Sequence, residues 1–262
     1  SIITETALST ALEREIALTD TTDMRLRFRR PSLLSAGAAL VTFSLLCGLG
    51  TWQVQRLGWK EDLIDKRMAR IDGPLITAAE LSSDLDAIEY RRLTVLGDYD
   101  HETEMLLSAS KREGTSGTNL VTLMRLTEPA FLAGQTLVVD RGYIPLDRRE
   151  PSSRPQTRQR GSVEVSGWIR KSWPPGLVFT PENDFTSRHM LIMDIQGYTA
   201  YLGQQALPFY LQAGPNGLKT LPLGQKPTID LPNRHAGYAI TWYGLALVLL
   251  GVFGAFHWRR RG

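Results

Sequence analysis

Two long stretches without charged side chains lie near the two ends of the chain. Residues 33–52 read LLSAGAALVTFSLLCGLGTW, and residues 236–258 read AGYAITWYGLALVLLGVFGAFHW, where only His257 can carry a charge. Twenty helical residues are about 30 Å long, which is the thickness of the hydrocarbon core of a bilayer. Arginines stand at the outer end of each stretch, an arrangement typical of membrane spans and not of buried core helices. The pattern therefore predicts transmembrane helices at residues 33–52 and 235–258.

The first stretch is predicted to be a retained anchor and not a cleaved signal peptide. Its apolar run is longer than the about 7–15 residues of a signal peptide, and a polar stretch of 32 residues precedes it. The only cysteine of the chain, Cys47, lies within this stretch. A single cysteine excludes an intrachain disulfide, a thiol redox pair and a covalent c-type haem site.

Residues 53–234 are predicted to form one β-rich domain. Apolar residues at helical spacing predict a helix from Gln53 to Ile71, which continues the first span until Gly73-Pro74 stops it. Beyond this point the pattern changes to alternating or short β-rich runs, and a short helix is expected at residues 196–205. The runs that predict strands are Arg91–Tyr99, Glu104–Ala109, Leu120–Leu126, Thr136–Arg141, Ser162–Ile169, Met190–Ile195 and Pro208–Gln212.

Strands at this spacing predict a mostly antiparallel barrel or sandwich. The predicted fold class is therefore a membrane protein in which two transmembrane α-helices, in helical hairpin topology, flank a β-rich α+β extracytoplasmic domain. Four arginines between residues 25 and 30 precede the first span, and Arg259 to Arg261 follow the second. Short arginine-rich tails stay in the cytoplasm, so we expect tails 1–32 and 259–262 there. A bacterial inner membrane is favoured over the mitochondrial inner membrane.

The distribution of charge argues against a nucleic-acid partner. The chain has 30 Lys and Arg against 27 Asp and Glu, a net charge of +3. Residues 53–234 carry 22 basic and 22 acidic side chains, so the excess belongs to the C-terminal arginines. A nucleic-acid-binding protein is expected to carry a basic face on its folded body.

The sequence does not indicate an enzyme. Residues 114–117 lack the spacing of a nucleophile elbow, no phosphate-binding loop is present, and His101-Glu102 lacks the second histidine of a zinc pair. One loop, residues 145–161, carries five arginines among prolines. It is either a docking loop for an acidic partner or a carboxylate-bearing ligand, or a solvated, mobile connection.

His235 stands where the chain enters the second predicted span, with Tyr238, Trp242 and Tyr243 after it. On a helix, positions 235, 238 and 242 share a face. Two interpretations remain open at this point. The aromatic residues can form an interfacial belt in which the histidine faces water, or the histidine can be an axial ligand of a membrane-borne haem.

Several motifs follow one another between and around the two spans: Gly50-Thr51-Trp52-Gln53 with Arg56 and Lys60, Tyr90-Arg91-Arg92 with Gly97, residues 138–145, residues 161–170, and residues 233–243. In this order the sequence resembles the Surfeit locus protein 1 family of cytochrome c oxidase assembly factors. Two positions depart from the family pattern. Met190-Leu191 stands in place of an aromatic pair, and Arg234 replaces a second Asn beside His235.

The resemblance implies a non-enzymatic factor that assists delivery or insertion of haem a into the catalytic subunit of cytochrome c oxidase. Its implied partners are that subunit, the haem a synthase and the lipid bilayer. A permanent accessory subunit or tether of a respiratory oxidase complex is the alternative.

The resemblance also implies that His235 serves the haem iron. Tyr238, Trp242, Tyr243, Trp52 and Arg56 would complete the cofactor-binding site. Arg234, or Arg56 and Lys60, would pair with the two haem propionates.

Overall fold

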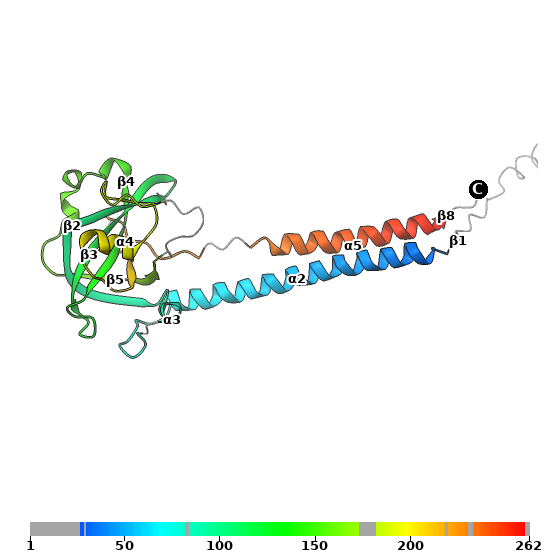
Figure 1. Ribbon diagram of the computed structural model, residues 1–262, viewed down its shortest axis with the longest axis horizontal. Helices are drawn as coiled ribbons and strands as arrows, with labels where there is room; N and C mark the ends of the chain where they lie inside the picture. The colour runs from blue at the N-terminus through cyan, green and yellow to red at the C-terminus, as the bar shows by residue number, and fades with distance from the viewer. Residues whose placement is uncertain are drawn as a thin grey trace, which may run out of the picture. The chain divides into compact units, whose positions relative to one another are not determined.

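The computed structural model describes residues 27–28, 30–81, 84–172, 182–217, 220–229 and 233–259 (Figure 1). The chain divides into two compact units. One unit, which we call the helical pair, comprises Ser1–Lys60 and Pro232–Gly262. The other, which we call the barrel domain, comprises Glu61–Leu231.

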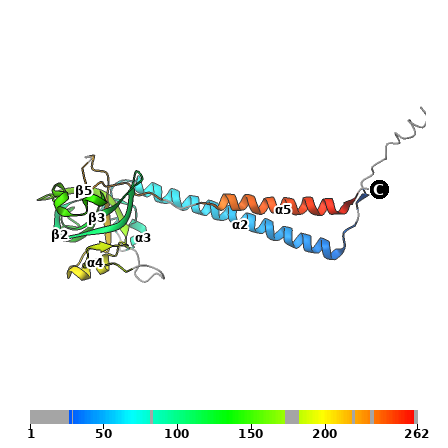
Figure 2. The ribbon, with the colours of Figure 1, turned by 90° about the horizontal axis from the view of Figure 1, so that it is seen from above.

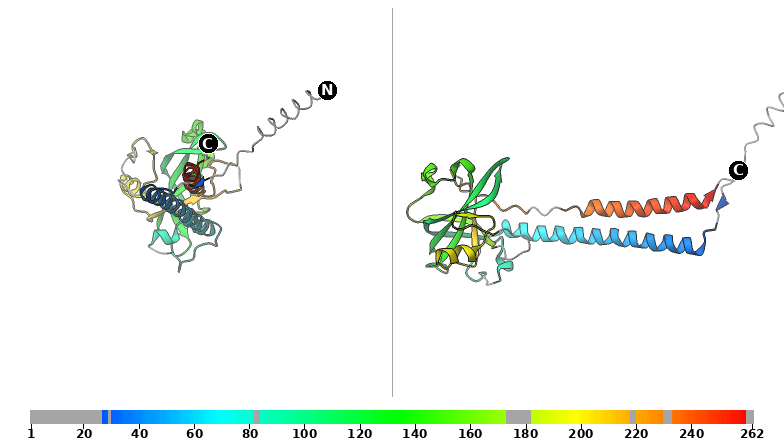
Figure 3. Two further views of the ribbon diagram at one scale, coloured as in Figure 1. Left: turned by 90° about the vertical axis from the view of Figure 1, so that its right-hand side faces the viewer. Right: turned by 45° about the horizontal axis from the view of Figure 1, so that its top comes forward.

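The helical pair is built from α2 (Leu33–Ile71), as far as its residue 60, and α5 (His235–His257). The two helices lie side by side in all views (Figures 1, 2 and 3). At one end of the pair, β1 (Arg27–Phe28) pairs antiparallel with β8 (Trp258–Arg259). The most apolar window of α2 is only 6% buried and that of α5 only 11% buried. These helices are therefore not core helices of a globular unit, and their length and composition are compatible with membrane spans.

Helix α2 continues well past the predicted span. It is one unbroken helix of 39 residues, so the prediction of a helix over residues 53–71 is confirmed. Its end is held within the barrel domain, because Trp168 Nε1 donates a hydrogen bond of 2.9 Å to the carbonyl oxygen of Ile71. Lys226 forms an ion pair of 2.5 Å with Asp72 directly after the helix.

The barrel domain contains a closed β-barrel. The sequence predicted a barrel or a sandwich, and the structure shows the barrel. Its strands are β2 (Arg92–Arg112), β3 (Thr115–Glu128), β4 (Thr136–Pro145), β5 (Val163–Lys171) and β7 (Phe209–Ala213). They are ordered β3-β4-β7-β5-β2, and an additional pairing of β3 with β2 closes the ring. Only β4 and β7 are parallel neighbours within the ring. The short β6 (His189–Met190) adds to β2 from outside it.

Three of the predicted strands need correction. Residues 92–99 and 104–109 belong to the single strand β2, which begins at Arg92 and whose register shifts between Asp100 and Met105. The predicted strand Met190–Ile195 is wrong beyond Met190. Met190, Met193 and Ile195 are all buried in one cluster, so this apolar segment packs into the core without forming a strand, and Ile195 already begins helix α4.

The sequence predicted one short helix in this region, and the structure confirms it. Helix α4 (Ile195–Leu202) begins after Asp194, whose carboxylate accepts the Gly197 N–H, and ends at Gly203 in the left-handed conformation. The remaining turns are α3 (Leu85–Ile88), η1 (Leu146–Arg148), η2 (Pro151–Ser153) and η3 (Pro155–Thr157).

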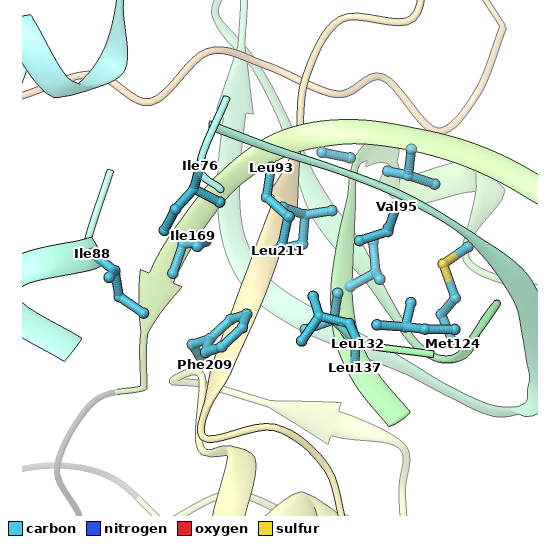
Figure 4. Packing of buried hydrophobic residues seen from close by; sticks show 14 residues of the cluster. Ile76, Ile88, Leu93, Val95, Met124, Leu132, Leu137, Ile169, Phe209 and Leu211 are labelled. Atoms are coloured by element: carbon cyan, nitrogen blue, oxygen red, sulfur yellow. The ribbon is translucent and has the colours of Figure 1, made fainter. Parts of the chain in front are cut away.

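The core lies on both faces of the central strands. Inside the barrel, Leu137 and Val139 of β4 join a cluster with Leu93, Phe209 and other apolar residues (Figure 4). Val138, between them, belongs to a second cluster that includes Tyr198 of α4, because successive strand residues point to opposite faces. Helix α4 thus covers β4 from outside, which explains why Leu137, Val138 and Val139 are apolar in succession instead of alternating with polar residues.

Candidate functional site

The predicted site at the start of α5 is tied to α2 by a hydrogen bond. His235 Nδ1 lies 2.7 Å from Oε1 of Gln53. Gln53 is only 9% exposed although it is polar. A carbonyl oxygen can only accept, so Nδ1–H is the donor in this contact, and in the neutral imidazole the lone pair then lies on Nε2. This is the arrangement of a metal-binding histidine whose second nitrogen is fixed by a neighbour.

A second contact fixes the two helices further along α5. The hydroxyls of Thr51 and Tyr243 lie 3.0 Å apart. A Cβ atom at Gly50 would stand 2.9 Å from the ring of Tyr243, so any larger residue there would displace this ring. Ala239 and Ala246 of α5 are also buried, and together with Tyr243 they have the spacing of one helix face. The Gly50-Thr51-Trp52-Gln53 motif is therefore a packing motif as well as a site motif.

The predicted site residues are only partly brought together. His235 and Trp242 are half-buried, and Tyr243 is in contact with α2. Tyr238 and Trp52 are each 54% exposed, on the outer surface of the pair. The Arg56 guanidinium lies 3.9 Å from the centre of the Trp59 ring.

Sequence reasoning missed the two partners on α2, Gln53 and Thr51, as site residues. They were visible only as letters of the family motif. Their signal is a polar side chain that follows an apolar span directly, but such residues are commonly solvated. The separation of 182 residues between Gln53 and His235 left no local pattern to join them.

A second polar centre lies in the barrel domain, at a β-bulge in β4. Leu120 pairs with Gly142 and Val121 with Asp140, so Arg141 has no partner on β3. Asp140 accepts the Gly142 N–H at 3.1 Å. Gly142 has a φ of +112°, and a Cβ there would stand 2.3 Å from the carbonyl oxygen of Leu223. The Asp140-Arg141-Gly142 sequence thus builds the bulge, which turns the Arg141 side chain out of its strand register.

Asp140 is buried, and burial disfavours the ionised form of its carboxyl group. Burial raises the pKa of Asp140 to about 6, although hydrogen bonds from Asn119 and Gly142 oppose the shift. The Asn119 amide donates to Asp140 Oδ2 at 2.9 Å. The carboxyl group therefore braces the bulge through two donors, and it titrates close to neutral pH.

The arginine-rich loop is held by its own side chains. Arg154, fully buried, forms a bidentate ion pair with Glu104, which is 6% exposed. The same guanidinium donates to Thr157 Oγ1 and to the carbonyl oxygens of Arg148 and Arg149. Arg158 pairs with Glu102 at the surface. Three short turns and these contacts give the loop a defined conformation. Arg154 is not available to a partner, because its guanidinium is bound within the loop and to Glu104.

No group of three or more His, Cys, Asp or Glu side chains that could hold a metal ion occurs among the residues that the structure describes. At the start of α5, His235 is the residue that could serve as a ligand, through Nε2.

The structure combines two exposed apolar helices, a polar contact that joins them, and a closed β-barrel whose sequence lies between them. These features define the class of the chain: a two-helix protein that carries a barrel domain. The chain belongs to the SURF1 family, whose model matches residues 40–247. This range includes Gln53, His235 and the complete barrel.

Individual relatives agree with this assignment. Surfeit locus protein 1 of Takifugu rubripes is 33% identical over 222 residues, which are 76% of this chain and 86% of that protein. Surfeit locus protein 1 of Homo sapiens is 30% identical over 219 residues, 76% of this chain and 69% of that protein. A SURF1-like protein of Monosiga brevicollis is 29% identical and covers 82% of both chains.

Proposed function

We propose that this chain is an assembly factor for haem-copper cytochrome c oxidase that holds haem a at His235 and passes it to the catalytic subunit. Membership of the SURF1 family supports the assembly role. The observation that carries the haem role is the hydrogen bond between His235 and Gln53, because it leaves the lone pair of Nε2 free for an iron atom.

The helical pair offers haem a an environment of suitable polarity. Haem a is very apolar, and the exposed apolar surfaces of α2 and α5 provide a lipid-like setting for it. The exposed Arg234, directly before His235, is a partner for a propionate, and Arg56 is a second. In this proposal the helices span a bacterial inner membrane with both tails in the cytoplasm and the barrel domain outside. The haem a synthase would supply the haem.

The assembly role predicts the phenotype of a deletion strain. We expect the oxidase subunits to remain present but to be poor in haem a, because the chain acts before maturation is complete. Difference spectra and immunoblots of the same membranes measure both quantities. Oxidase with normal haem content in the deletion strain would rule out an assembly role. Recovery of the chain in stoichiometric amount with mature, haem-loaded oxidase would favour a permanent subunit instead.

The ligand role predicts the haem content of the purified protein. In cells that make haem a, we expect His235→Ala to retain at least about tenfold less haem than the wild type. We expect Gln53→Leu to lower retention by about tenfold, since partners that orient a ligand histidine have effects of this size. His257→Ala is the matched control, because His257 lies at the opposite end of α5, and its haem content should be unchanged. Equal haem in His235→Ala and the wild type would exclude the ligand role.

A further inference from the structure

A cavity of about 650 Å³ lies in the barrel domain, within the range of sizes typical of small-molecule sites. Its wall includes Tyr99 of β2, Arg141 of β4 and Val163 of β5. The ordered arginine-rich loop contributes Gln156 and Gln159. Strand β5, the end of β7 and the segment that follows it complete the wall. Apolar side chains, amides, hydroxyls and the exposed Glu164 line the cavity. Its buried charged group is Arg141, which the bulge turns out of its strand register.

The Arg141 guanidinium is incompletely satisfied. Arg141 is 5% exposed. Its Nη2 donates to the carbonyl oxygen of Thr157, and its guanidinium lies 4.2 Å from the centre of the Tyr99 ring. Its Nη1 is buried and has no hydrogen-bond acceptor within the described part of the chain. A buried donor without an acceptor is costly and more so when it is charged.

The charges around Arg141 do not balance. Two guanidinium groups, Arg141 and Arg154, are buried in this region, but the nearby carboxylate of Glu104 is already bound in bidentate form by Arg154. Burial raises the pKa of Tyr99 to about 12, so its phenol is neutral near pH 7 and cannot serve as a counter-ion. Glu164 is exposed on the cavity wall and forms no ion pair with Arg141 among the described residues. One buried positive charge is left without a carboxylate, which is energetically unfavourable.

We infer that this cavity binds a small organic acid whose carboxylate pairs with Arg141. A carboxylate is the planar, two-oxygen anion that a guanidinium recognises best, and it would supply both the missing acceptor and the missing charge. The amides of Gln156 and Gln159 can donate to the same group, and the body of the acid would lie against Val163 and Val165. This site lies in the barrel domain and is independent of the proposed haem role of His235.

The test uses the full-length protein in neutral detergent and para-fluorobenzoate as the probe, observed by fluorine NMR. The neutral para-fluorobenzamide has nearly the same shape and is the control ligand. We expect the acid to bind at least about tenfold more tightly than the amide, the ratio that one charge-assisted hydrogen bond supplies. Equal binding of the two compounds, or no binding of either, would overturn the inference.

Two variants locate the binding. Arg141→Met should weaken the binding of the acid by at least about tenfold and leave the binding of the amide nearly unchanged. Val163→Trp fills the cavity but keeps Arg141, so it should abolish binding of both compounds even where Arg141→Met fails to fold. The matched control is Arg158→Met, whose arginine is paired with Glu102 at the surface, and it should bind like the wild type. Unchanged binding in Val163→Trp would place the probe elsewhere and contradict the inference.

A capped acidic peptide, acetyl-Glu-Asp-Glu-amide, tests whether the carboxylate belongs to a polypeptide. We expect it to bind more weakly than para-fluorobenzoate, because a branched chain with three charges fits poorly in a cavity that holds one buried cation. Tighter, Arg141-dependent binding of the peptide would overturn the assignment to a small acid.

Discussion

Replacing Arg154 by alanine is expected to lower the free energy of unfolding of the barrel domain by about 3–5 kcal/mol, because it leaves a buried carboxylate without its partner. The arginine is fully buried, and its guanidinium binds Glu104 and three further acceptors of its own loop. Urea unfolding of the full-length protein, followed by tryptophan fluorescence, measures the change. The buried Trp168 reports on the barrel.

Arg158→Ala is the matched control for this prediction. It lies in the same loop and also pairs with a glutamate, Glu102, but the two side chains are 40% and 79% exposed. An exposed ion pair contributes less than about 1 kcal/mol, so this variant should unfold almost like the wild type. Equal effects of the two substitutions would contradict a structural role for the buried pair. The double variant Arg154→Leu/Glu104→Leu should recover much of the lost stability, because neither member of the buried pair is left behind without its partner.

Gly142→Ala is expected to destabilise the barrel domain by about 3 kcal/mol or more, since it combines a clash with an unfavourable backbone conformation. The new Cβ would stand 2.3 Å from the Leu223 carbonyl oxygen at a φ of +112°. The segment that contains Leu223 would have to leave β4. The two hydrogen bonds that join Tyr143 and Leu223, at 3.0 and 2.9 Å, would break.

Amide hydrogen exchange separates this local effect from general destabilisation. The amides of Tyr143 and Leu223 should lose protection in Gly142→Ala before other amides of β4 do. Gly134→Ala is the control, because Gly134 also has a positive φ, +81°, but nothing lies within 4 Å of the point that a Cβ would occupy there. Gly134→Ala should lower the free energy of unfolding by about 1–2 kcal/mol, from backbone strain alone. Similar losses in both variants would exclude the close approach of Leu223 as the cause.

Much of the fold could be predicted because the strands carry local patterns. The apolar run of β4 and the alternation at the start of β2 are properties of short segments. Closure of the barrel could not be predicted, because it depends on β2, which pairs with β5 along its first residues and with β3 from Leu96 onward. Polar residues from Asp98 to Glu102 made this one strand look like two.

The candidate sites differ in how far the sequence reveals them. His235 could be singled out because it stands at the end of an apolar stretch beside aromatic residues. Gln53 could not, because its burial exists only when the two helices are packed together. Arg141 was visible in a motif, but its unpaired state depends on Glu104, which is distant in sequence and already bound by Arg154.

The helical pair is fastened at both of its ends. The pairing of Arg27–Phe28 with Trp258–Arg259 joins the helices at one end, and the hydrogen bond between Gln53 and His235 joins them at the other. One helix therefore cannot slide along the other by a turn, about 5.4 Å, unless both fastenings open together. Relative motion within the pair is thereby limited to rotation or local unwinding near its ends, while the axial register of the helices stays fixed.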